Sequence, residues 1–134
     1  MVSFMHLLII KRTEITRPLY SFFAEISSGL CDKIHSKFQT YIQYGDVYSC
    51  KSLKTLNSKI WKYKGTIYKL RVDNGKESAR VLFSKSKNGD LKIIHAFLKS
   101  TRKTPAKEAR QAISIYQTLD DLETVIWDEQ LKLC

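Results

Sequence analysis

The chain has 134 residues, a mass of 15.6 kDa and a formal net charge of +10, because 23 Lys and Arg residues stand against 13 Asp and Glu residues. Its hydrophobic share of 43% excludes a disordered or collagen-like chain and is typical of one compact domain, which we take as residues 1–134. Three cysteines without a Cys-x-x-Cys spacing argue against a secreted disulfide framework and a zinc ribbon, and favour the reducing cytoplasm.

The first elements predicted are a buried strand and a helical hairpin. Residues 4–11 are short and apolar, far below the roughly 20 residues of a membrane span, and no signal-peptide cleavage site follows them. Thr16 and Pro18 then stand as the cap and the early-turn proline of a helix. Apolar residues recur at helical spacing over 19–42, and the interruption at 27–29 divides them into two helices. We therefore expect an N-terminal helical hairpin and no membrane partner.

The middle of the chain predicts a loop and then a three-stranded meander. The second helix should end at Gly45 as a C-cap glycine, and residues 46–64 carry five lysines and few structural signals. Two Asn-Gly pairs follow, which supply the positive φ that a tight hairpin turn requires. They separate three strand-like runs, residues 66–72, 78–84 and 91–98. These runs predict an antiparallel meander whose second connection is longer than two residues.

The C-terminal part predicts further helices. Thr104 and Pro105 stand as the N-cap and first residue of a helix. The apolar stripe of this helix is Ala109, Ala112, Ile113 and Tyr116. The acidic residues 119–134 are expected to form a helical extension, whose buried positions are Leu122, Val125 and Ile126. Together with the meander, these elements predict an α+β fold.

Positive charge is concentrated in the middle of the chain. Residues 51–110 carry a net charge of +13, against +1 for residues 1–50 and −4 for residues 111–134. Such a segment repels itself unless an anionic partner compensates, and a polyphosphate backbone is the usual partner. The charge therefore predicts a nucleic-acid-binding protein, the alternative being a basic protein whose charge only keeps it soluble.

Strand alternation groups three of these cations. Apolar side chains alternate with Lys69 and Arg71 in the first strand of the meander and with Arg80 in the second, and alternate side chains share a face. We expect the three cations to converge on the second face of the sheet as a phosphate site. Ordinary solvated cations on an open sheet face are the alternative.

The third strand of the meander is apolar on both faces, which predicts a central strand covered on both sides. His95 lies on this strand, where it could be a packed core histidine or a proton-transfer group, and Lys99 shares its face if the strand continues. The cations of residues 99–103 come just before a helix N-terminus, where backbone N–H groups also favour anions.

Other catalytic templates are absent from the sequence. There is no Gly-rich phosphate loop, no His-Glu-x-x-His and no Gly-x-Ser-x-Gly, and the three histidines are too scattered to propose as metal ligands. Carboxylates are scarce in the basic segment, which argues against a two-metal nuclease. If the protein cuts RNA, we expect a metal-independent reaction. The RNA 2′-OH would attack the adjacent phosphate, cations would stabilise the added charge, and a group of lowered pKa would move protons.

Three stretches resemble the RelE/HigB superfamily of type II toxin–antitoxin toxins, particularly its phage-derived branch. They are residues 68–71, residues 79–83 around Arg80, and residues 95–108, which contain the branch's H-x-F-x-K and T-P-x-x-E patterns. The sequence departs from the branch's pattern at Ala79, Phe83 and Ser100. The resemblance covers about residues 65–113. It implies a RelE-like fold, a small antiparallel sheet with an N-terminal helical hairpin and C-terminal helices.

The resemblance also implies a ribosome-dependent mRNA endonuclease (an mRNA interferase) that inhibits translation in the cytoplasm without a cofactor. Its partners would be the ribosome, mRNA, rRNA and a cognate antitoxin, usually a helix-turn-helix DNA-binding protein. By position, Lys69 and Arg71 would bind or activate the RNA, and Arg80 would stabilise the cleaved phosphate. His95 and Lys99 would transfer protons or contact phosphate. Further RNA- and ribosome-binding residues are expected at Lys54, Lys62, Lys64, Arg102, Lys103 and Lys107.

Two alternatives stay open. The related ParE branch shares the fold and poisons DNA gyrase without being an enzyme, although the Lys- and Arg-rich sheet and the Lys-Thr-Pro run argue against that activity. A degenerate, non-toxic RNA-binding module is the other, for which Ser100 in place of a lysine is an indication.

Overall fold

The computed structural model describes residues 6–44, 53–99, 104–128 and 130–133. Their elements are β1 (Leu7–Ile10), α1 (Arg17–Glu25), α2 (Ser28–Tyr44), β2 (Leu53–Thr55), α3 (Ser58–Trp61), β3 (Tyr68–Asn74), β4 (Glu77–Lys85), β5 (Leu91–Leu98), α4 (Ala106–Gln117), a 3-10 turn (Leu119–Asp121) and β6 (Thr124–Ile126). The strands form one sheet in the order β2-β3-β4-β5-β1-β6. The predicted α+β fold is confirmed, but the sheet is mixed because β1 pairs parallel with β5.

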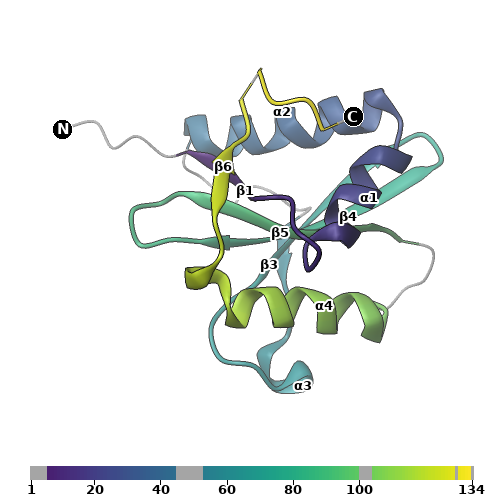
Figure 1. Ribbon diagram of the computed structural model, residues 1–134. Coiled ribbons are helices and arrows are strands. Elements are labelled where there is room, and N and C mark those ends of the chain that lie inside the picture. The colour runs from purple at the N-terminus through teal and green to yellow at the C-terminus, as the bar shows by residue number, and fades with distance from the viewer. Residues whose placement is uncertain (1–5, 45–52, 100–103, 129, 134) are drawn as a thin grey trace.

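Helices cover both faces of this sheet (Figure 1), with α1 and α2 on one face and α4 on the other. On the face toward α1 and α2, Phe38 of α2 packs edge-on against Phe83 of β4, with ring centroids 5.1 Å apart. On the opposite face α4 buries Ala109, Ala112 and Ile115. β5 lies between β4 and β1 and is almost entirely buried, as its apolar character on both faces predicts.

The N-terminal strand and helical hairpin are confirmed. Thr16 is the N-cap residue of α1, but its hydroxyl donates to the Lys11 carbonyl and accepts from the Thr13 N–H instead of capping the helix. The predicted C-cap Gly45 lies outside the described residues. Cys31 of α2 takes part in a disulfide bond, so the prediction of reduced cysteines is wrong for this residue. No helix in the described ranges combines the length and the apolar character that a membrane crossing requires.

The predicted loop over residues 46–64 is wrong in its second half, which contains β2 and α3. Asn57 caps α3, because its side-chain oxygen accepts from the N–H groups of Lys59 and Ile60. Three and four residues are too few for either element to show a period in the sequence.

The predicted meander of β3, β4 and β5 is confirmed, with a different first turn. Asn74 still belongs to β3 and pairs with Glu77, so the turn consists of Gly75 and Lys76. Gly75 has a φ of +61°, and Lys76 is not among the residues of positive φ. A glycine in the first central position is typical of a type II′ turn. The second connection has five residues, Ser86–Asp90, and is longer than two residues as predicted.

Helix α4 begins one residue later than predicted, because Pro105 and not Thr104 is its N-cap residue. The Thr104 hydroxyl instead accepts a hydrogen bond of 2.9 Å from the ammonium of Lys69. In the predicted stripe Ala109 and Ala112 are buried, whereas the other two positions are partly exposed.

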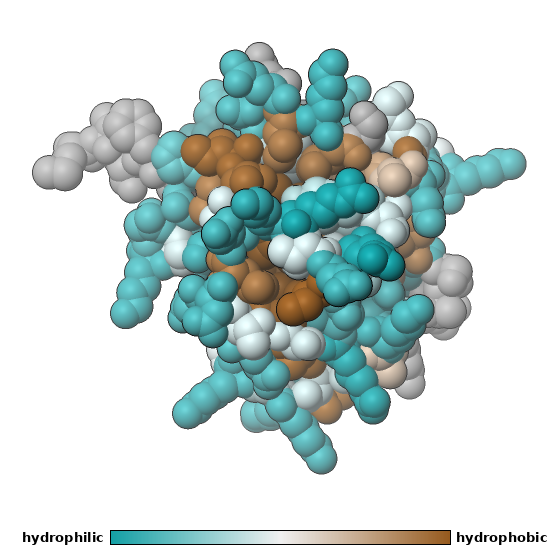
Figure 2. All heavy atoms as spheres, in the orientation of Figure 1, coloured by the Kyte–Doolittle hydropathy of each residue, from teal (hydrophilic) through white to brown (hydrophobic). Residues whose placement is uncertain are grey.

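The predicted helical extension over residues 119–134 is wrong for the part of it that the structure describes. After the 3-10 turn the chain extends at Leu122 and forms β6, which pairs antiparallel with β1 at the edge of the sheet. Val125 is therefore half-buried and Ile126 is 49% exposed, while Trp127 is buried against Phe23 with ring centroids 5.3 Å apart. Figure 2 shows hydrophobic side chains reaching the surface in this region of β6.

Candidate functional site

The strand register gathers five cations on the face of the sheet that α4 partly covers. Directly opposed residues of neighbouring strands share a face, and Lys54 lies opposite Lys69 while Arg71 lies opposite Arg80. The Lys99 N–H donates to the Ser78 carbonyl, which extends the β4–β5 register by one position. We call these five residues the cationic cluster: Lys54, Lys69, Arg71, Arg80 and Lys99. The predicted convergence of Lys69, Arg71 and Arg80 is present, and Lys99 and Lys54 join them.

Burial and the repulsion between like charges lower the proton affinity of two lysines of the cluster, Lys69 and Lys99. Partial burial lowers the pKa of Lys69, and the charges of Lys99, Arg80 and Lys54 lower it further. The pKa of Lys99 is lowered by the same kinds of cause, first by desolvation and then by neighbouring cations. A lysine of lowered pKa holds a larger fraction of neutral amine near neutral pH, so it is better able to accept a proton.

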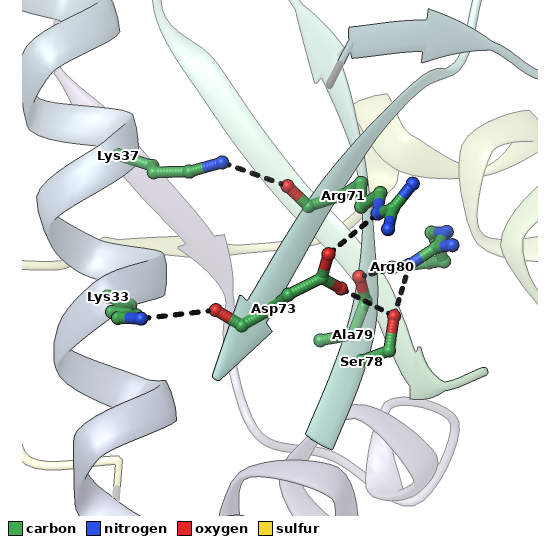
Figure 3. Close-up of polar contacts among 7 residues, drawn as sticks. All are labelled: Lys33, Lys37, Arg71, Asp73, Ser78, Ala79 and Arg80. Atoms are coloured by element: carbon green, nitrogen blue, oxygen red, sulfur yellow. Dashed lines mark hydrogen bonds and ion pairs between the residues drawn. The ribbon is translucent and has the colours of Figure 1, made fainter. Parts of the chain in front are cut away.

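The two arginines of the cluster are held in place through one carboxylate (Figure 3). Asp73 accepts from Arg71 Nε at 2.8 Å with one oxygen and from the Ser78 hydroxyl at 2.6 Å with the other. Arg80 Nη1 in turn donates to Ser78 Oγ at 2.9 Å and to the Ala79 carbonyl at 3.0 Å. The hydrogen bond from Ser78 lowers the pKa of the Asp73 carboxyl most; burial opposes this shift, and the hydrogen bond and charge of Arg71 and the charge of Arg80 lower the pKa further. Sequence reasoning missed Asp73, although it shares the strand face of Lys69 and Arg71 two residues further on.

Two lysines of α2 support the strand that carries this arrangement. Within the described part of the chain, β2 pairs with Tyr68–Leu70 of β3 and with no residue beyond Leu70. Lys33 donates to the carbonyl of Asp73, and Lys37 donates to the carbonyl of Arg71, both at 3.3 Å (Figure 3). These bonds give the carbonyl groups of Asp73 and Arg71 a hydrogen-bond donor from α2.

His95 lies in the core between β5 and α4. It is 1% exposed, and its Nε2 is 3.4 Å from a carboxylate oxygen of Glu108. Burial lowers the pKa of His95, while the charge and hydrogen bond of Glu108 oppose that shift. Its Nδ1 has no hydrogen-bond partner among the residues that the structure describes. This position corresponds to the packed histidine that the sequence left open, and it separates His95 from the exposed part of the cluster.

The other predicted RNA-binding residues are spread more widely. Lys62 is the C-cap residue of α3 and has a φ of +54°, and Lys64 and Lys107 are exposed on the surface. Arg102 and Lys103 lie outside the described residues. Lys64 lines a hollow with three lysines that sequence reasoning did not single out, Lys85, Lys87 and Lys92.

The described site therefore offers positive charge and hydrogen-bond donors rather than metal ligands. Within the described ranges no group of three or more His, Cys, Asp or Glu side chains lies together as a metal site. The chemistry available from the cluster is the binding of an anion, with Lys69 and Lys99 as candidates for proton transfer and Arg71 and Arg80 as donors to negatively charged oxygens.

Comparison with known proteins places this arrangement in a family. A search of the curated proteins found no match. The family model described as "Phage derived protein Gp49-like" matches residues 28–117, which run from the start of α2 to the end of α4 and include the whole cationic cluster. The chain belongs to the phage-derived Gp49-like family, a RelE/HigB-like family of type II toxin–antitoxin toxins.

Proposed function

We propose that the protein is a HigB-like mRNA interferase, a toxin that cleaves mRNA on the ribosome. The observation that carries this proposal is the cationic cluster, in which two pairs of like charges, Lys54 with Lys69 and Arg71 with Arg80, lie directly opposite each other. Like charges in directly opposed positions destabilise a sheet. A polyanion would relieve their repulsion, and RNA presents such a charge at every nucleotide.

In the proposed reaction the RNA supplies its own nucleophile. The 2′-oxygen attacks the adjacent phosphorus, the bond from phosphorus to the 5′-oxygen breaks, and a 2′,3′-cyclic phosphate remains. The neutral amine of Lys69 accepts the proton of the 2′-OH, and the ammonium of Lys99 donates a proton to the leaving 5′-oxygen. Arg71 and Arg80 donate hydrogen bonds to the phosphate oxygens, whose charge increases in the transition state. The site thus needs no metal ion for this step.

The two lysines suit these opposite roles through their surroundings. Lys69 is part-buried, and three cations lower its pKa in addition to the effect of burial. Its ammonium donates to Thr104 when protonated, a bond that positions the nitrogen at the N-terminal end of α4. Lys99 follows β5 directly, and its pKa is lowered first by desolvation and then by the charge of Arg80. A lowered pKa makes its ammonium a better proton donor, which suits the role of general acid.

A toxin of this family implies a cognate antitoxin. We propose a helix-turn-helix protein for that partner, and the ribosome, mRNA and ribosomal RNA as the toxin's targets in the cytoplasm. Lys54, Lys62, Lys64, Arg102, Lys103 and Lys107 are the proposed contacts to RNA outside the cleaved bond.

The test is to induce the protein without its antitoxin and to map the 5′ ends of cellular messages. We expect growth arrest with cuts inside translated messages, and Arg80→Ala should reduce cleavage about 100- to 1,000-fold, the usual loss for one transition-state donor. Lys76→Ala, which removes a cation from the exposed β3–β4 turn, is the matched control and should cleave as the wild type does. Intact messages with DNA damage would instead indicate a gyrase poison, and harmless expression would indicate a non-toxic RNA-binding module.

A further inference from the structure

A hollow lined by lysines lies at the other end of α4 from the cationic cluster. Its volume of about 630 Å³ falls within the range of about 300–1,000 Å³ typical of ligand sites. The β4–β5 hairpin contributes Lys85, Lys87 and Lys92, and Lys64 comes from the segment before β3. None of these four lysines forms an ion pair within the described residues. Among the described residues of the lining, Asp120 carries the one carboxylate, so positive charge dominates there.

The backbone around the hollow is held by hydrogen bonds. The Ser86 N–H donates to the Asp90 carbonyl at 2.9 Å, and the Gly89 N–H donates to the Ser86 carbonyl at 3.0 Å. The Asp90 carboxylate accepts from the Asn88 side chain and from the backbone N–H of His6. The hairpin that carries three of the lysines is therefore fixed before any ligand binds, which lowers the entropic cost of binding.

The opposite wall is held by Tyr116 of α4. Its hydroxyl accepts from the Thr66 N–H at 3.1 Å, and an added Cβ on Gly65 would lie 2.1 Å from the same oxygen. Gly65 also has a φ of +107°, a conformation that other residues rarely adopt. This close approach fixes the backbone beside Lys64.

The lining has two chemically different halves. The lysines and the β4–β5 hairpin favour an anionic group, such as a phosphate. Gln117 ends α4, where the helix presents carbonyl oxygens and favours hydrogen-bond donors, and Asp120 lies in the 3-10 turn that follows. A ligand that fits both halves carries negative charge together with hydroxyl or amino groups. A nucleotide of RNA has this combination, in its phosphate on one side and its ribose or base on the other.

The hollow and the cluster share one face of the sheet. Arg80 and Ser84 of β4 point to the same face because they are four residues apart, a distance of about 13 Å at the usual rise of a strand. Leu82 lies between them and is fully buried. We propose that the hollow is a second RNA-binding site, which holds a nucleotide at a distance from the one that is cleaved. This inference rests on the proposed function, because it assigns the hollow to the same class of ligand.

The test measures RNA binding without cleavage. A fluorescent single-stranded RNA of 2′-O-methyl nucleotides cannot be cut by the proposed reaction, and it is titrated with wild type and with Lys85→Ala/Lys92→Ala. We expect the double variant to bind the RNA at least about tenfold more weakly than the wild type. In a plot of the logarithm of the binding constant against the logarithm of the salt concentration, the slope should become shallower by about 0.7 for each lost phosphate contact. The control Lys76→Ala/Lys132→Ala removes the same charge elsewhere and should bind within about twofold of the wild type, since its lysines lie outside the hollow.

A second arm identifies the source of the RNA. Co-sedimentation with ribosomes is compared for the same variants. If the hollow variant binds the RNA oligomer more weakly, the hollow binds the message. If it binds the oligomer normally and only its co-sedimentation with ribosomes is weaker, the hollow binds ribosomal RNA. If the hollow variant matches the control in both arms, the proposal is wrong. A ¹⁵N titration with an RNA dinucleotide gives a local check, because the amides of Ser86 and Gln117 must shift if the hollow binds it. Neither arm measures cleavage, so a protein that binds here but cuts nothing would refute the proposed function and keep this inference.

Discussion

The opposed pair of Lys54 and Lys69 gives the sharpest test of the cationic cluster. The two residues lie directly opposite each other on β2 and β3. Like charges in this position destabilise a sheet by about 0.2–1 kcal/mol. A double-mutant cycle with Lys54→Gln and Lys69→Gln should therefore show a repulsive coupling of that size in the free energy of unfolding. The hydrogen bond from Lys69 to Thr104 is lost on both sides of the cycle, so it cancels from the coupling.

The assay is urea unfolding of the four proteins at low and at high salt. At about 0.01 M salt the screening length is about 30 Å and the repulsion acts fully, whereas at about 1 M salt it is about 3 Å and the coupling should nearly vanish. The same Lys54→Gln substitution should weaken RNA binding, so stability and function should change in opposite directions. A coupling of zero at low salt, or an attractive one, would contradict the idea that the cluster carries unrelieved repulsion.

The surroundings of Lys69 and of Gly65 lead to further predictions. Because burial and neighbouring cations lower the pKa of Lys69 from 10.5, cleavage should rise with pH through that lowered pKa, and Lys54→Gln should move the rising limb to higher pH. Between the lowered pKa and 10.5 the unfolded state binds more protons at this residue than the folded state, so stability should rise with pH over that window. Gly65→Ala should lower the free energy of unfolding by about 2 kcal/mol or more, because the new Cβ meets the Tyr116 hydroxyl at 2.1 Å and the φ is +107°; thermal unfolding measures it.

Matched substitutions separate the causes in these two cases. Lys76→Gln removes a cation from the β3–β4 turn and should leave the pH limb where it is, so an equal displacement would exclude a local effect on Lys69. Gly75→Ala introduces the same side chain at a φ of +61° with nothing within 4 Å of the new Cβ. It should cost only the backbone strain, about 1 kcal/mol, and equal costs at both glycines would show that the contact with Tyr116 is unimportant.

The fold could be predicted where the sequence carries a long period or strong turn chemistry. α1 and α2 have the long period and the meander has the turn chemistry, and the sequence predicts each of them within two or three residues of its observed bounds. β6 could not be found in this way, because three residues give no period and the surrounding acidic segment has apolar residues at helical spacing. Its β-branched residues Thr124, Val125 and Ile126 are a signal for a strand, but the edge of β1 that they occupy is a tertiary feature that local sequence does not contain.

The candidate site could be predicted where it depends on alternation along a strand, and less where it depends on register. Alternation alone placed Lys69, Arg71 and Arg80 on one face. That Arg71 lies directly opposite Arg80, and that Lys54 belongs to a strand at all, depends on pairing between strands. The hollow at the other end of α4 depends on contacts between Tyr116 and Gly65, which are 51 positions apart in the chain.

The hydrogen bonds of Arg71 and Arg80 determine which of their N–H donors are available to a ligand of the cationic cluster. The Asp73 carboxylate accepts a hydrogen bond directly from Arg71, whereas Arg80 is linked to it through the Ser78 hydroxyl. One negative charge therefore stabilises two guanidinium groups. The hydrogen bonds of the described residues use Nε of Arg71 and Nη1 of Arg80. Each guanidinium has five N–H donors, so most of them stay available for phosphate oxygens. The arrangement therefore fixes the direction of both groups and leaves most of their repulsion to be relieved by the ligand. An antitoxin that covers this surface must supply the same relief, which predicts carboxylate side chains where it contacts Arg71 and Arg80.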